Sequence, residues 1–198
     1  MRHPVSKHLF AYWRRLRGPR PAPERADINP ADLGRLLPHM FVLEGTGDGA
    51  FRIRIAGSRL CALFDTELRG TDLQALMAPE AVDDLRDILA IVATDLNPVI
   101  AGASVLLMNE APAAAELLLL PLLHRSQPGE RLLGCLTFGA ELPPPRVACL
   151  GIDIISFRVI DDSETRFLHP PEPELPIHLR GMAERRGHLT VLEGGQHP

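Results

Sequence analysis

The chain has 198 residues, of which 45% are hydrophobic and 23% charged, so it can bury one core of ordinary domain size. Its formal net charge of −4 gives no overall electrostatic reason to expect a nucleic-acid partner. Cys61, Cys135 and Cys149 lack the spacing of a zinc site or a disulfide framework. The most apolar run, residues 115–124, is too short for a spanning helix. We therefore expect a cytoplasmic protein without a transmembrane segment.

Residues 5–17 predict an amphipathic helix, because apolar side chains recur at helical spacing, at Leu9, Tyr12, Trp13 and Leu16. A glycine–proline pair ends the pattern, and a proline-rich spacer follows it. An isolated helix of this length is marginal in water and needs a surface. We therefore expect Tyr12 and Trp13 to cap a sheet or to form a partner or dimer surface.

Residues 40–44 and 51–55 predict a β-hairpin, with GTGDG between them as the turn. Period-two alternation in the second strand favours an antiparallel sheet with one buried and one solvated face. Its predicted buried residues are Phe51, Ile53 and Ile55, and its outward residues, candidates for a partner surface, are Arg52 and Arg54.

Helical segments are predicted after the hairpin. Ser58 is a candidate N-cap for a short helix over residues 59–64, and Thr71 is one for a later turn. Residues 79–96 carry an apolar stripe at steps of three and four, with a proline and acidic residues in the first turn. They predict the longest helix of this region.

Three β-like segments follow, at residues 99–109, 113–126 and 131–140, and short turns between them predict a meander. Two strands, a helical crossover and a meander indicate an antiparallel α+β sheet. One further strand is predicted over residues 151–160, with no place assigned to it. The predicted parts are residues 1–26 (helix and spacer), 27–141 (domain), 142–161 (extension) and 162–198 (mostly disordered tail).

The segment GSRLCALFDTELRGTDLQALMAPEAVDDL, residues 57–85, resembles the PAS domain family. Its parts are an apolar–aromatic pair at Leu63-Phe64, a tight corner, the Glu-Leu-x-Gly motif at residues 67–70, and a Pro-acid helix start at Pro79-Glu80. The resemblance implies a five-stranded antiparallel sheet of order 2-1-5-4-3, with a helical crossover on one face and an N-terminal capping helix. It also implies a sensory or docking role.

The chain is most similar to a bacterial branch of stand-alone, single-PAS-domain proteins of unassigned function. That similarity rests on Tyr12-Trp13, on Arg25 with Asp27-Ile28-Asn29-Pro30, and on the strand Phe51 to Gly57. Asp65 departs from the pattern, because the family has glycine there. Aspartate tolerates a left-handed backbone, so we expect the corner to survive.

PAS domains hold small ligands between the sheet and the helices, and apolar periodicity does not distinguish such a cavity from a filled core. Both alternatives stay open for the candidate residues Phe51, Ile53, Ile55, Leu63, Phe64, Leu118, Leu120 and Cys135.

No cofactor is expected, because the flavin cysteine motif is missing and residues 79–96 contain no histidine for heme. No metal site and no catalytic constellation is recognised. We expect a non-catalytic signalling module that forms a homodimer, contacts other signalling proteins and holds at most a small ligand. Two alternatives are a nucleic-acid or membrane-surface arm at residues 13–20, and a small α+β enzyme.

Overall fold

The computed structural model describes residues 1–138 and 148–160, and the backbone of residues 183–186 and 189–192. Residues Met1–Asp161 form one compact unit, and Asp162–Pro198 form a second. Strands β7 (Ala183–Arg186) and β8 (Leu189–Leu192) of the second unit pair with each other. The disordered tail predicted for 162–198 falls mainly on residues outside this description, and it stays a prediction.

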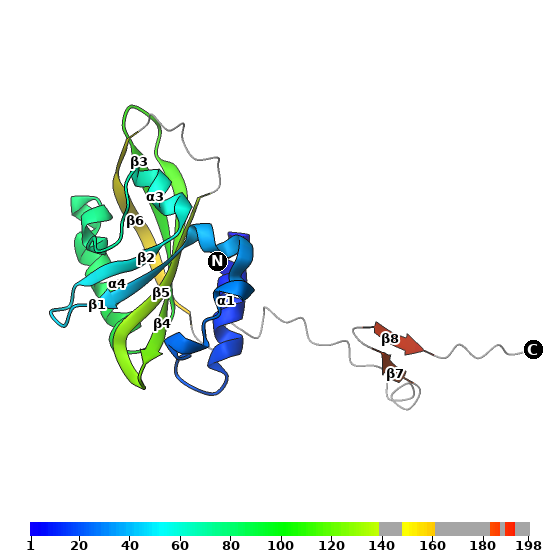
Figure 1. Ribbon diagram of the computed structural model, residues 1–198. Helices are drawn as coiled ribbons and strands as arrows, with labels where there is room; N and C mark the ends of the chain where they lie inside the picture. The colour runs from blue at the N-terminus through cyan, green and yellow to red at the C-terminus, as the bar shows by residue number, and fades with distance from the viewer. Residues whose placement is uncertain (139–147, 161–182, 187–188, 193–198) are drawn as a thin grey trace, which may run out of the picture. The chain divides into compact units, whose positions relative to one another are not determined.

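The first unit is built on one antiparallel sheet of six strands, in the order β2-β1-β5-β4-β3-β6 (Figure 1). The α+β class and the predicted order 2-1-5-4-3 of the first five strands are confirmed. The strand expected at 151–160 forms as β6 and extends the sheet beyond β3. The strands are β1 (Met40–Gly45), β2 (Phe51–Ala56), β3 (Val99–Leu107), β4 (Ala113–His124), β5 (Gln127–Phe138) and β6 (Cys149–Val159).

Helices cover both faces of this sheet, with α4 on one side and α1 on the other (Figure 1). We call the α4 side the inner face; its cover is α3 (Ser58–Phe64), η3 (Leu73–Leu76), η4 (Pro79–Ala81) and α4 (Val82–Thr94). We call the α1 side the outer face; its cover is α1 (Pro4–Arg17), η1 (Arg25–Asp27), α2 (Pro30–Leu33) and η2 (Gly34–His39).

The ends of α1 and α3 follow from local chemistry. The Val5 N–H donates to Nδ1 of His3 at 3.2 Å and so caps the start of α1. Gly18 ends this helix at φ +55°, a backbone conformation that costs glycine little. Asp65 ends α3 in the left-handed region, at φ 49° and ψ 36°, as expected for an aspartate that replaces glycine.

Three local predictions are corrected. Gly57 occupies the N-cap position of α3, so Ser58 is the first helical residue and not the cap. Asp72 caps η3, because its Oδ1 accepts the Gln74 N–H at 3.0 Å, and Thr71 does not. The helix predicted over 79–96 begins as the 3₁₀ turn η4, and α4 ends at Thr94.

Two register features also differ from the prediction. The β1–β2 ladder pairs Leu43 with Ile53 and Val42 with Ile55, so Arg54 is an extra residue that bulges β2. Arg125 and Ser126, with φ of 52° and 61°, make the β4–β5 turn. The turn expected between the segments 113–126 and 131–140 therefore belongs to β5, which begins at Gln127. A two-residue turn with positive φ matches the twist of a hairpin and lets the strands pair up to it.

Each face of the sheet has its own hydrophobic cluster. The inner cluster joins α3 and α4 to alternate residues of the strands, including Leu43, Ile53, Leu85 and Leu89. The outer cluster joins α1 and the spacer to the intervening residues, including Trp13, Leu118 and Leu133. The central part of the sheet is therefore buried on both faces, which explains why β4 is apolar at nearly every position.

Candidate functional site

Helix α1 is anchored to the outer face by its aromatic residues. Trp13 is only 1% exposed, and its Nε1–H donates to the carbonyl oxygen of Pro121 in β4 at 2.7 Å. The Tyr12 hydroxyl accepts the N–H of Asn29 at 3.0 Å, so the same helix also holds the spacer. These side chains face the chain's own sheet, so the capping role is the one observed, and their role as a partner or dimer surface stays a prediction.

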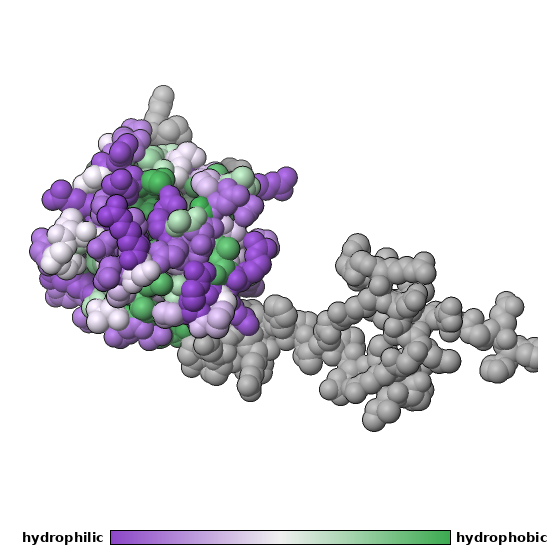
Figure 2. Space-filling view, turned by 60° about the horizontal axis from the view of Figure 1, so that its bottom comes forward, coloured by the Kyte–Doolittle hydropathy of each residue, from purple (hydrophilic) through white to green (hydrophobic). Residues whose placement is uncertain are grey.

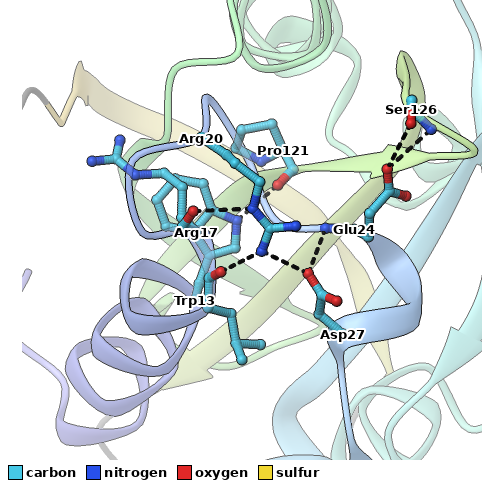
Figure 3. Close-up of polar contacts among 8 residues, drawn as sticks. Trp13, Arg17, Arg20, Glu24, Asp27, Pro121 and Ser126 are labelled. Carbon is cyan, nitrogen blue, oxygen red and sulfur yellow. Dashed lines mark hydrogen bonds and ion pairs between the residues drawn. The ribbon is translucent and has the colours of Figure 1, made fainter.

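The spacer after α1 is fixed by a small polar network at one end of the sheet (Figure 3). Arg20 Nη2 lies 2.8 Å from Asp27 Oδ2 and 2.6 Å from the Leu16 carbonyl oxygen. Glu24 Oε1 accepts the Ser126 N–H at 3.0 Å, at the β4–β5 turn. These contacts are partly exposed, so each contributes little alone, and together they set the path of residues 18–29.

A pocket of about 330 Å³ lies between the spacer and the outer face of the sheet. Its spacer side includes Ile28, Leu33 and Leu37, and its sheet side is apolar, with Met40, Val42, Ile55, Leu122 and Leu133. Leu37 and Ile55 remain 41% and 50% exposed, whereas the deeper lining residues are buried. Figure 2 shows one face of the molecule, on which hydrophobic surface occurs as patches between hydrophilic residues.

Gly57 allows η2 to come close to the sheet beside this pocket. A Cβ atom at this position would lie 2.3 Å from the Leu37 carbonyl oxygen and 2.4 Å from that of Pro38. The Gly57 N–H donates to the Met40 carbonyl oxygen at 2.7 Å, which fixes the same approach. The glycine of the FRIRIAG strand thus has a steric role in shaping the pocket.

Arg25 is the charged residue of the pocket lining. Its side chain is half-buried, and among the residues that the structure describes no carboxylate pairs with its guanidinium. The acids beside it in the sequence are engaged elsewhere, Glu24 with Ser126 and Asp27 with Arg20. The pocket therefore combines an apolar lining with one positively charged side chain.

The structure does not bring the eight predicted pocket residues together. Phe51, Ile53 and Leu63 belong to the inner cluster, and Phe64 packs against it. The other four lie on the outer side, with Ile55 at the rim of the pocket and with Leu118, Leu120 and Cys135 buried in the outer cluster. Of the two alternatives left open for this set, one cavity shared by all eight residues is not what the structure has, because they belong to clusters on opposite faces of the sheet.

Arg52 and Arg54 are exposed, as predicted for the outward residues of β2. Arg54 Nη1 lies 2.8 Å from Glu44 Oε2, and Arg131 Nη2 lies 2.5 Å from Glu44 Oε1. Arg54 forms its ion pair with Glu44 of the neighbouring strand β1. Arg52 forms an isolated antiparallel backbone bridge with Asp72. The Glu44 carboxylate is shared by the guanidinium groups of Arg54 and Arg131, so the described residues around β2 do not favour a bound anion.

Two described titratable groups on the outer side of the sheet, Cys135 and His39, have shifted pKa values. Burial raises the pKa of the Cys135 thiol to about 12, and its Sγ donates to Ser6 Oγ at 3.8 Å. Burial lowers the pKa of His39 below its ordinary value, and the charges of Arg59 and His3 lower it further. In the described part of the chain, no three histidine, cysteine, aspartate or glutamate side chains are placed to share a metal ion.

The first unit is thus an antiparallel α+β sheet wrapped by short helices on one face, with a helix docked on the other. The family profile described as PAS domain matches residues 1–137, so the chain belongs to the PAS domain family. No curated protein sequence matches the chain.

Among solved structures, the chain is similar to the "Structure of an RNA-binding Light-Oxygen-Voltage Receptor", with 16% sequence identity and a TM-score of 0.40. The match covers 66% of this chain and 33% of that chain, so this chain spans about a third of its length.

The helices of the described residues include none that is both long enough and apolar enough to cross a membrane.

Sequence reasoning missed the outer-face pocket, although the Arg25-x-Asp27-Ile28 spacer and Gly57 had been singled out as motif residues. Apolar periodicity marked Ile55 as buried, and only the bulge at Arg54 turns it to the outer face. A glycine directly after a strand, where the chain enters a helix, was the available signal of a close backbone approach.

Proposed function

We propose that the chain is a non-catalytic PAS-type sensory and protein-interaction module of bacterial signalling, in which a small ligand in the outer-face pocket controls the docking of α1 and the spacer. The position of the pocket carries this proposal. One wall belongs to the spacer and η2, and the other belongs to the sheet. An occupant therefore contacts both the cover and the surface that it covers.

Binding energy at such a site is linked to docking. A ligand that binds only the docked state stabilises it by about 2.7 kcal/mol at a concentration one hundred times its Kd. The shift equals the differential affinity of the ligand for the docked and undocked states. Undocking of α1 would expose Trp13 and the outer cluster to a partner protein or to a second copy of the chain.

The cofactor, location and partners follow from the sequence expectations. The module works in the cytoplasm without flavin or heme, and its output is a contact with a homodimer partner or with another signalling protein. The alternative of a basic nucleic-acid or membrane arm gains little support here. Arg20 is bound to Asp27, and the guanidinium carbons of Arg15 and Arg17 lie 5.4 Å from the ring centroids of Tyr12 and Trp13.

Native mass spectrometry of freshly purified protein, compared with its denatured mass, tests whether the pocket retains a ligand. The proposal predicts a bound mass in the wild type that is reduced in Ile55→Trp, which places an indole at the pocket rim. Ile155→Trp is the matched control, because Ile155 is 66% exposed in β6 and does not line the pocket.

The two variants distinguish specific binding in the pocket from non-specific binding to exposed apolar surface. A bound mass that survives Ile55→Trp unchanged contradicts a ligand in this pocket. Protein that carries no extra mass is then titrated with the probes described below, since a freely exchanging ligand is lost during purification.

A further inference from the structure

We infer that the outer-face pocket binds a small linear monocarboxylate amphiphile, with its carboxylate on Arg25 and its alkyl chain against the apolar wall of the sheet. This inference rests on the proposed function, because it assigns a ligand class to the same pocket.

The apolar part of this ligand is indicated by the walls and by the rim. Val42, Leu122 and Leu133 form a floor of aliphatic side chains that are at most 8% exposed. At the rim, Leu37 and Ile55 are 41% and 50% exposed, although large aliphatic side chains gain free energy on leaving water. An alkyl chain in the pocket covers both rim residues and makes no demand for hydrogen bonds.

The anionic head is indicated by Arg25. The guanidinium is always charged and matches a carboxylate through two parallel N–H···O bonds. Its position in a half-buried lining strengthens such a pair relative to one in open water. Glu24 and Asp27 are held by Ser126 and Arg20, so they leave the Arg25 head group available to a ligand.

The single charge of the pocket lining, on Arg25, and the modest volume of the pocket narrow the class of ligand further. One unpaired cation is matched by one negative charge, which favours a carboxylate over a doubly charged phosphate. The volume of about 330 Å³ lies at the lower end of the ~300–1,000 Å³ range for small-molecule sites. A medium-length alkyl chain therefore fits, and decanoate is the probe of choice.

The test is a calorimetric titration of the full chain with decanoate and with decan-1-ol, both below their aggregation concentrations. The variants are Arg25→Gln and, as a matched control, Arg35→Gln, an exposed arginine that does not line the pocket. In the wild type we expect decanoate to bind more tightly than decan-1-ol. We expect Arg25→Gln to weaken the binding of decanoate by about tenfold and the binding of decan-1-ol by less than about twofold. Arg35→Gln should change neither.

A chain-length series tests the apolar half of the site. Each methylene added between hexanoate and decanoate should raise the affinity about fourfold while the chain still enters the pocket. A flat series, equal binding of acid and alcohol, or an Arg25→Gln variant with unchanged decanoate affinity overturns the ligand class. Binding to phosphatidylglycerol vesicles without any binding of free decanoate overturns it in favour of a lipid surface.

The outcomes also separate this inference from the proposed function. If decan-1-ol binds and protects the amides of α1 from hydrogen exchange, whereas decanoate does neither, the ligand class fails and the proposed function stands. If decanoate binds through Arg25 without any change in α1, the ligand class stands and the proposed switch fails. If neither probe binds, both are overturned.

Discussion

The two faces of the sheet are covered in different ways. The inner face is covered by α3 and α4, which lie in the connection between β2 and β3, and side chains such as Leu85 and Leu89 are at most 1% exposed. The outer face is covered by an N-terminal helix and a spacer that precede the sheet in the chain. Its contacts combine one large anchor, Trp13, with hydrogen bonds and a pocket that remains open.

The difference assigns different roles to the two covers. Removing the inner cover would expose the core between the helical crossover and the sheet. The contacts of the inner face therefore determine the free energy of global unfolding. The outer cover precedes β1 in the chain and contributes no strand to the sheet. It can therefore leave the sheet without breaking the β-ladders, which is the requirement for a local switch.

The largest expected effect is that of Trp13→Ala. Truncation of a fully buried tryptophan costs about 3–5 kcal/mol, and here it also leaves the Pro121 carbonyl oxygen without its donor. We expect hydrogen exchange to show loss of protection in α1 and retained protection in α4.

Two variants accompany this prediction. Trp13→Phe keeps most of the ring volume and should lose about 1–3 kcal/mol through the missing hydrogen bond. Leu89→Ala, on the inner face, should weaken protection throughout the first unit. Equal loss of protection in α1 and α4 after Trp13→Ala would contradict the distinction between the two covers.

Gly57→Ala should cost about 1–3 kcal/mol, measured by chemical denaturation, because the added methyl group collides with the backbone of η2. The same displacement should weaken ligand binding at the pocket. Gly102→Ala is the control, since its Cβ atom would meet the Ser156 hydroxyl at 3.3 Å and this side chain can rotate away. A smaller loss for Gly57→Ala than for Gly102→Ala would remove the steric role of Gly57.

Asp27→Ala should lower the free energy of unfolding by about 1 kcal/mol, because Asp27 both pairs with Arg20 and accepts the Glu24 N–H at 3.0 Å. Arg20→Gln removes the partly exposed ion pair and the exposed hydrogen bonds of Arg20 to the Leu16 and Arg17 carbonyl oxygens, and should cost about 0.5 kcal/mol. Thermal melts of the two variants check this order. The reverse order would show that the ion pair, and not the turn, holds the spacer.

The smallest expected effect is a pH dependence from His39. Burial, followed by the charges of Arg59 and His3, lowers its pKa in the folded state, so the folded chain binds this proton less readily than the unfolded chain. The associated stability is complete above the unfolded value near 6.5 and decreases as the pH falls through the lower folded pKa. Denaturation between pH 7 and pH 5 should show a shallower loss in His39→Gln than in the wild type; equal losses would argue against this role.

The sequence predicted the fold well where one pattern had one interpretation. The alternation of the strands predicted an antiparallel sheet, and the resemblance carried by the motif at residues 57–85 implied the strand order that the structure has. The left-handed corner at Asp65 was also correct, because few residue types tolerate that backbone conformation.

The site was harder to predict, for identifiable physical reasons. In β4 both faces are buried, so Leu118 and Leu120 could not be distinguished from their neighbours by polarity. In β2 a bulge of one residue moved Ile55 to the opposite face, which a period-two pattern cannot foresee. The pocket itself depends on contacts between the spacer and the sheet that are distant in the sequence.

Native-state hydrogen exchange of the wild type, measured in increasing denaturant, tests most directly whether the outer cover is a separate unit. We predict that amides of α1 and of the spacer exchange through a local opening whose free energy is well below that of global unfolding. Amides of α4 and β5 should exchange only by global unfolding. A single common free energy for α1, α4 and β5 would contradict the switch, because the outer cover would then leave the sheet only when the whole domain unfolds.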